Sequence, residues 1–203
     1  MNHLIVISHP RQESFNYAIL QTLVEASEAA GDSVKVRDLY QENFEPVLSL
    51  SDLANVKKGT LSSDILREQE YIQWADWISF VFPLWWNGFP AMLKGYVDRV
   101  FTNGFAFRSD EEGIHGLLSG KKAMVVTTSG MDEEDLEQYG LKKSLFITQD
   151  WGVFKFAGME IMEHQYLGGV THISDAARQK MLKQLRKTFF QNHPEISVEK
   201  TVE

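Results

Sequence analysis

The chain has 203 residues, of which 43% are hydrophobic and 24% charged, a composition typical of one globular domain. It contains no cysteine, which excludes disulfides, thiolate metal sites and a cysteine nucleophile. Its formal net charge of −8 argues against nucleic-acid binding as the main activity, because that binding needs a positive field. No apolar run approaches the ~20 residues that span a bilayer, so we expect a cytoplasmic protein without a membrane segment.

Short apolar runs alternate with longer stretches of helical spacing. In chain order, strands are predicted over residues 4–7, 34–39, 77–82, 123–126 and 159–162. Helices are predicted to follow them over residues 14–30, 63–74, 90–100, 142–156 and 174–189. The stretch 41–60 is poorly periodic. Residues 194–203 are predicted to form a loose C-terminal tail, so we expect one domain over residues 1–193.

Strands separated by helix-length segments predict βαβ units, and therefore a parallel sheet with helices on both faces. The first, third and fourth strands are continuously apolar, as strands buried on both faces are, whereas the second alternates and the fifth is mixed. The first, third and fourth strands are therefore predicted to be central, and the second and fifth to lie at the edges. This arrangement predicts an α/β fold with a doubly wound, five-stranded parallel sheet. The predicted strand order is 2-1-3-4-5, the flavodoxin-like order.

A ligand of such a sheet binds beyond the carboxyl ends of the strands, where the strand order reverses. Three loops converge there, over residues 9–14, 83–89 and 127–130. The first leads into a helix N-terminus, which favours phosphate, and the second places two tryptophans beside a glycine, which favours a flat ring. The third offers hydroxyl groups and backbone donors. Together they indicate a pocket for a phosphorylated ring system such as a flavin; the alternative is that Ser14 only caps a helix and the tryptophans belong to the core.

Several short motifs occur through most of the chain: His9-Pro10, Ser14-Phe15-Asn16-Tyr17-Ala18, Asp38-Leu39-Tyr40, Phe82-Pro83-Leu84 with Trp86, Gly88 and Pro90, and Leu93-Lys94-Gly95. Together they resemble the NAD(P)H:quinone oxidoreductase family, which includes the DT-diaphorases and the bacterial modulator-of-drug-activity and potassium-efflux-ancillary reductases. The resemblance covers roughly residues 3–190 and implies a homodimer that binds a flavin non-covalently. It further implies two-electron hydride transfer from NAD(P)H to quinones or related aromatic acceptors by a ping-pong mechanism.

The resemblance also implies site residues. On the phosphate side of the flavin these are His9, Ser14, Phe15 and Asn16. Along the isoalloxazine ring and its polar edge they are Pro83, Leu84, Trp85, Trp86, Asn87, Thr127, Thr128, Ser129 and Gly130. We expect FMN, with FAD as the alternative because Arg178 matches a family arginine near the adenine half of FAD. Phe105 and Phe107 are the expected substrate-site residues, although Phe107 stands where animal enzymes have a tyrosine.

Proton donation is assigned by the same resemblance to the loop after the fourth strand, where animal members use a tyrosine and a histidine. That loop, residues 131–140, contains no histidine, so Tyr139 is the candidate catalytic donor; the alternative is a surface tyrosine. The histidines show no spacing typical of metal ligands, and we expect no metal site. Two other functions stay open: a flavodoxin-like single-electron carrier and a regulatory flavoprotein subunit of a transporter.

Overall fold

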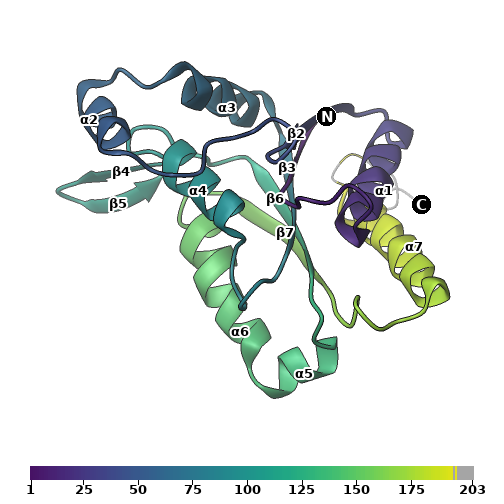
Figure 1. Cartoon of the computed structure of the whole chain (residues 1–203). Helices are drawn as coiled ribbons and strands as arrows, with labels where there is room; N and C mark the ends of the chain where they lie inside the picture. Colours follow the sequence, from purple (N-terminus) through teal and green to yellow (C-terminus); the bar gives the residue numbers. More distant parts are fainter. Residues whose placement is uncertain (194, 196–203) are drawn as a thin grey trace.

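A five-stranded parallel sheet forms the centre of the protein in a computed structural model that describes residues 1–193 and 195 (Figure 1). Its order is β2-β1-β3-β6-β7, which in chain order is the predicted 2-1-3-4-5, so the predicted topology is confirmed. The strands of this sheet are β1 (Asn2–Ile7), β2 (Ser33–Asp38), β3 (Trp77–Pro83), β6 (Lys122–Thr128) and β7 (Glu160–Leu167). The predicted tail lies outside the described residues, apart from Glu195.

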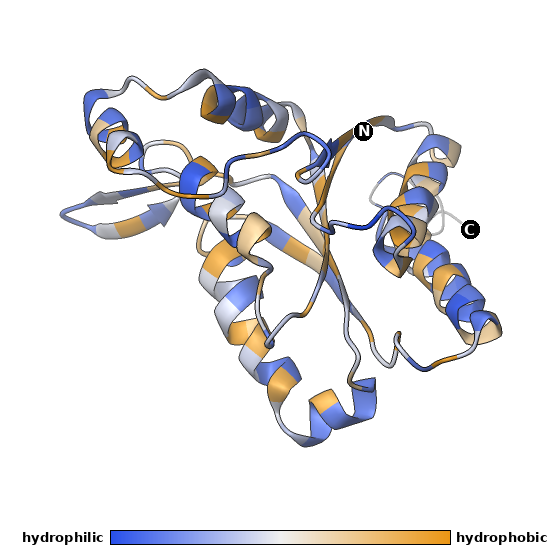
Figure 2. Cartoon of the chain, in the orientation of Figure 1, coloured by the Kyte–Doolittle hydropathy of each residue, from blue (hydrophilic) through white to orange (hydrophobic). Residues whose placement is uncertain are grey.

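Helices cover both faces of the sheet (Figure 1). One face carries α1 (Phe15–Ala29) and α7 (Asp175–Asn192), and the other carries α3 (Ser63–Trp74), α4 (Ala91–Val100), α6 (Leu141–Leu145) and η1 (Phe146–Lys155). The two sides of the central strands therefore belong to two separate apolar cores. Figure 2 shows the apolar residues gathered along these strands. No helix among the described residues is long and apolar enough to cross a membrane.

Three elements were not predicted. The helix α2 (Leu50–Lys58) lies in the poorly periodic stretch, begins at a capping box between Ser49 and Asp52, and buries none of its residues. The short antiparallel hairpin of β4 (Phe107–Asp110) and β5 (Gly113–Gly116) is mostly exposed. The helix α5 (Glu133–Gln138) lies in the loop after β6. All three are short and bury little apolar surface, so hydrophobic periodicity gives no signal for them.

A single arginine on α4 anchors α2. The Arg99 guanidinium donates to both carboxylate oxygens of Asp52, at 3.1 and 3.2 Å, and to Asp64 on α3 at 2.9 Å. The hydrogen bond from Arg99 is the main reason why the pKa of Asp52 falls to about 2. The attachment of α2 therefore depends on an ion pair more than on buried apolar area.

The predicted helix over residues 142–156 is confirmed as helical, but its second part, η1, is a π-helix. Runs of π-helix are rare and often occur at functional sites. Here the wide turns bury Gln149 and Asp150, while Phe146 and Trp151 remain partly exposed. This arrangement brings a carboxylate into the interior beside β7.

Candidate active site

A hollow of about 400 Å³ lies at the carboxyl end of the sheet, where the order reverses between β1 and β3. Backbone hydrogen bonds tie its walls together: Ser8 N–H donates to Val81 O at 3.0 Å and Leu84 N–H to Thr128 O at 2.7 Å. The hollow brings together many of the predicted flavin residues, namely His9, Ser14, Phe15, Asn16, Pro83, Leu84, Trp85, Thr128, Ser129, Gly130 and Arg178. It also includes three residues that were not among the predicted site residues: Arg11, within the predicted loop 9–14, and Val170 and Thr171.

The start of α1 presents polar groups that lack a partner among the described residues. Ser14 is the N-cap residue, but its side chain makes no capping hydrogen bond, and its Oγ is buried and unpaired. Asn16 donates from Nδ2 to Thr128 Oγ1 at 3.0 Å, whereas its Oδ1 is buried and unpaired. Buried polar atoms are normally hydrogen-bonded, and leaving one unpaired costs about 1–3 kcal/mol. Together with the free N–H groups of the first helical turn, these atoms fit a phosphorylated ligand.

His9 closes the hollow beside α1. Its Nδ1 lies 3.1 Å from both the N and the O of Arg11, and this contact leaves Nε2 for a ligand. Burial lowers the pKa of His9, so that the ring is neutral near pH 7. Its ring also packs against Trp85 at a centroid distance of 5.9 Å, which orients the first tryptophan of the rim.

The second tryptophan of the rim is held in an unusual backbone conformation. Trp86 and Asn87 both have φ of 53°, and Gly88 N–H donates to Trp85 O at 3.2 Å, which is the geometry of a tight primed turn. A left-handed conformation at a bulky residue costs about 1–3 kcal/mol and is often found at functional sites. Trp86 is fully exposed. Trp86 and Asn87 therefore project from the rim and do not line the hollow in this chain.

Thr127 lies on the opposite side of β6 from the hollow. Its Oγ1 is 3.1 Å from His164 Nε2, and His164 Nδ1 is 2.8 Å from Asp150 Oδ1. All three side chains are buried, and the His164 ring stacks on Tyr166 at 3.8 Å. Because successive strand residues face opposite sides of a sheet, Thr128 faces the hollow and Thr127 does not. The structure thus does not bring Thr127 to the expected cofactor edge.

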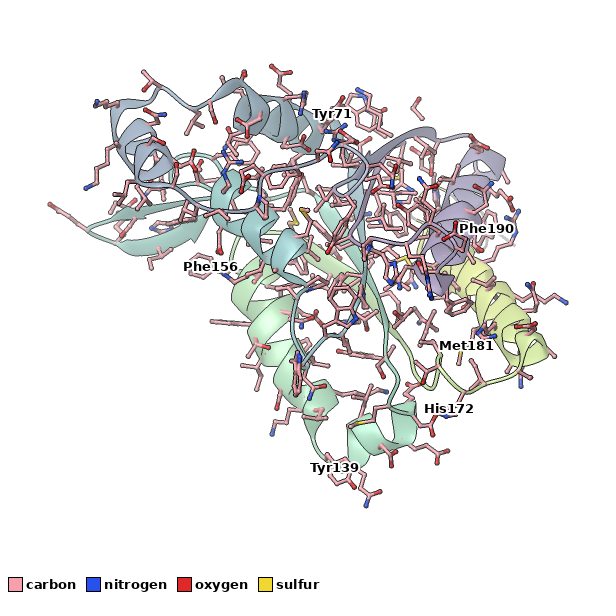
Figure 3. All side chains as sticks on the ribbon, viewed as in Figure 1. Tyr71, Tyr139, Phe156, His172, Met181 and Phe190 are labelled. Carbon is pink, nitrogen blue, oxygen red and sulfur yellow. The ribbon has the colours of Figure 1, made fainter. Side chains whose placement is uncertain are left out.

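The candidate proton donor and the candidate substrate residues also lie outside the hollow. Tyr139 ends α5, is 67% exposed and projects from the foot of the molecule (Figure 3). Its role as a donor stays a prediction. Phe105 is half-buried, and Phe107 lines a larger hollow of about 720 Å³ between α2, α4 and the β4–β5 hairpin. Its lining has two cations, Arg99 and Lys57, and two carboxylates, Asp52 and Asp98, and Arg99 is already paired with Asp52, so this hollow is a weaker candidate for an anionic ligand.

Arg178 connects the hollow to a second one. Its guanidinium donates to Val170 O at 3.0 Å and to Asp175 Oδ1 at 2.5 Å. An adjoining hollow of about 380 Å³ lies between α1 and α7 and shares several lining residues with the first. The shared residues are Arg11, Ser14, Phe15, Val170 and Arg178.

Comparisons with known proteins agree with this geometry. A family model described as a flavodoxin-like fold matches residues 1–189. An uncharacterised NAD(P)H oxidoreductase of Haemophilus influenzae is 40% identical over 184 residues, which cover 90% of this chain and 91% of that protein. The NAD(P)H dehydrogenase (quinone) 1 of Cavia porcellus is 33% identical over 205 residues, covering 91% of this chain and 74% of that protein. The solved structure of an NAD(P)H:quinone oxidoreductase from Methanothermobacter marburgensis has a TM-score of 0.83 and 32% identity, with 92% of this chain and 94% of that chain covered. The chain therefore belongs to the flavodoxin-like family in which these NAD(P)H oxidoreductases are found.

Proposed function

We propose that this protein is a flavin-dependent NAD(P)H:quinone oxidoreductase. The start of α1 is the observation that carries the proposal, because the buried Ser14 Oγ and Asn16 Oδ1 have no hydrogen-bond partner within residues 1–193 and 195, at the point where the fold binds its ligands. The activities named for the relatives supply the substrate class.

Each wall of the hollow would have its own task. The helix start and His9 would bind the flavin phosphate, Trp85 would lie against the ring, and the backbone around Thr128 to Gly130 would donate to its polar edge. When bound, the flavin supplies the two-electron chemistry between NAD(P)H and the quinone. The protein contributes binding and orientation.

FMN and FAD differ in what they require beyond the phosphate. FMN needs only the hollow at the start of α1, and it is the cofactor we propose. FAD is the second candidate, because the adjoining hollow between α1 and α7 offers room for a further nucleotide. Heat release of the flavin followed by chromatography against both standards distinguishes them.

We propose further that two copies of the chain associate through the exposed face of η1. Phe156 N–H donates to Trp151 O at 3.0 Å, and Phe146 lies five residues before Trp151, so these three aromatic residues follow one another along the π-helix. They are 37–58% exposed, which is unusual for a contiguous aromatic surface and typical of association surfaces. By contrast, Phe101 and Ala106, in the apolar segment that follows α4, are buried in the core of the same chain. Sedimentation analysis is expected to show a dimer, and Trp151→Glu a monomer.

The function is tested with purified protein. We expect a yellow protein with one flavin per chain, whose flavin absorbance is bleached anaerobically by NAD(P)H and restored by a quinone. A colourless protein that takes up neither FMN nor FAD would contradict the proposal.

A further inference from the structure

Arg11 stands out among the arginines of the chain. Within residues 1–193 and 195 its guanidinium has neither an ion-pair nor a ring partner, whereas every other arginine has at least one. It lines both the hollow at the start of α1 and the adjoining hollow between α1 and α7. In a chain with a net charge of −8, a cation that lacks a carboxylate partner is a favourable place for an external anion.

The backbone of Arg11 is fixed beside the phosphate-binding groups. Its N lies 3.1 Å from His9 Nδ1, and its carbonyl accepts a hydrogen bond from Ser14 N–H at 3.2 Å. Ser14 is only 7% exposed, and its Oγ is unpaired at the same helix start. Arg178, across the hollow, already donates to Asp175 and to the Val170 carbonyl, so of the two arginines that line this hollow only Arg11 makes no hydrogen bond from its guanidinium to the described part of the chain.

We infer that Arg11 is the residue that selects phosphorylated flavins: its guanidinium pairs with the phosphate bound at the start of α1, so that this chain discriminates FMN and FAD from riboflavin. This inference rests on the proposed function. A guanidinium presents a planar fork of donors that matches phosphate oxygens, and such charge-assisted hydrogen bonds are about twice as strong as neutral ones. Riboflavin carries the same ring but no phosphate, so it gains nothing from Arg11.

The test compares two ligands with a set of variants. The full-length protein is stripped of flavin, and the dissociation constants of FMN and riboflavin are measured by fluorescence for the parent, Arg11→Gln and Arg11→Lys. Arg67→Gln is the matched control, because it removes the same charge from an exposed side chain on α3, on the other face of the sheet. FAD is titrated in parallel to learn whether the substitution of Arg11 changes the binding of its diphosphate as it changes the binding of the FMN phosphate.

We expect Arg11→Gln to weaken FMN binding by about 10- to 100-fold, the range for a hydrogen bond to a charged group, and to change riboflavin binding less than 2-fold. Arg11→Lys should recover part of the loss, and Arg67→Gln should change neither constant. The salt dependence of FMN binding should also decrease in Arg11→Gln.

Two results would overturn the inference alone: unchanged FMN binding by Arg11→Gln, or an equal loss for FMN and riboflavin, which would indicate a general disturbance of the loop. A parent protein that binds none of the three flavins would instead refute the proposed function, and the inference with it.

Discussion

Acidification from pH 7 to pH 5 is expected to destabilise the protein through one buried histidine. His3 on β1 is 1% exposed, and its ring nitrogens lie 2.5 Å from Ser27 Oγ and 2.8 Å from Ser79 Oγ. Its ring also stacks on Phe189 and lies tilted against Trp77. Burial in these surroundings lowers the pKa of His3 from 6.5 to about 3, because a charged ring would lose its hydration.

The sign and size of the effect follow from proton linkage. The unfolded chain binds a proton at His3 below about pH 6.5, whereas the folded chain binds it only near pH 3. The stabilisation by neutral His3 is therefore complete above pH 6.5 and is lost as the pH falls through this window. Each pH unit within the window changes the free energy of unfolding by about 1.4 kcal/mol, so the loss between pH 7 and pH 5 is about 2 kcal/mol.

The assay is urea unfolding, followed by circular dichroism and tryptophan fluorescence, of the parent and of His3→Gln at both pH values. Glutamine can still hydrogen-bond to Ser27 and Ser79, but it does not titrate. The other histidines are common to both proteins, so their contributions cancel when the two pH-dependent losses are subtracted. A difference of about 2 kcal/mol is expected. Equal losses in the two proteins would refute the reasoning, because they would show that His3 binds its proton equally well in both states.

Four further predictions concern single side chains. Ser14→Ala should weaken FMN binding by about 10-fold in fluorescence titrations. It should not destabilise the flavin-free protein, since this serine does not cap its helix, and the loss of its buried unpaired hydroxyl should raise the free energy of unfolding by up to about 1–3 kcal/mol. His164→Leu should lower the free energy of unfolding in urea by about 3–5 kcal/mol, because the buried Asp150 carboxylate loses its partner; His164→Gln should cost less. Asp52, whose folded pKa is about 2, stabilises the docked α2 above about pH 4 and loses this effect as the pH falls towards 2. Pepsin should therefore cleave within α2 increasingly over that range, and Asp52→Asn should remove the dependence. Tyr139→Phe should slow flavin reduction by NAD(P)H by about 10- to 100-fold at unchanged flavin content, if Tyr139 is the proton donor; identical stopped-flow traces would assign it to the surface.

The sheet order was predictable because burial leaves a mark in the sequence of each strand. In the structure β3 is buried at every position, and β1 at all but its first, whereas β2 at the edge alternates. The hairpin β4–β5 and the helix α2 left no such mark. The stability of α2 comes from its capping box and from the distant Arg99, and only the first of these is visible locally, as the spacing of Ser49 and Asp52.

The site was predicted less completely, for geometric reasons. Thr127 and Thr128 were both assigned to the hollow, yet the alternation of a strand permits only one of them to face it. Val170 and Thr171 were missed because they follow β7, the last strand of the sheet, and are held at the hollow by backbone hydrogen bonds to the loop after β6, such as that from Val170 N–H to Ser129 O at 3.0 Å. The predicted match of Arg178 was the one signal that pointed to this part of the chain.

Three local departures from ordinary folding rules meet at the carboxyl edge of the sheet. An N-cap serine does not cap its helix, a tryptophan occupies a left-handed backbone conformation, and Arg11 forms no ion pair with any residue of 1–193 or 195. Each departure costs free energy or forgoes a stabilising contact in the free protein, and each lies on or beside the hollow. A ligand that carries both an anion and a flat ring fits this edge: the anion can pair with the helix start and the guanidinium, and the ring can lie against Trp85, the tryptophan that lines the hollow. Because no neutral or purely aromatic ligand does this, the combination favours a phosphorylated flavin over a quinone alone as the first molecule that the hollow binds.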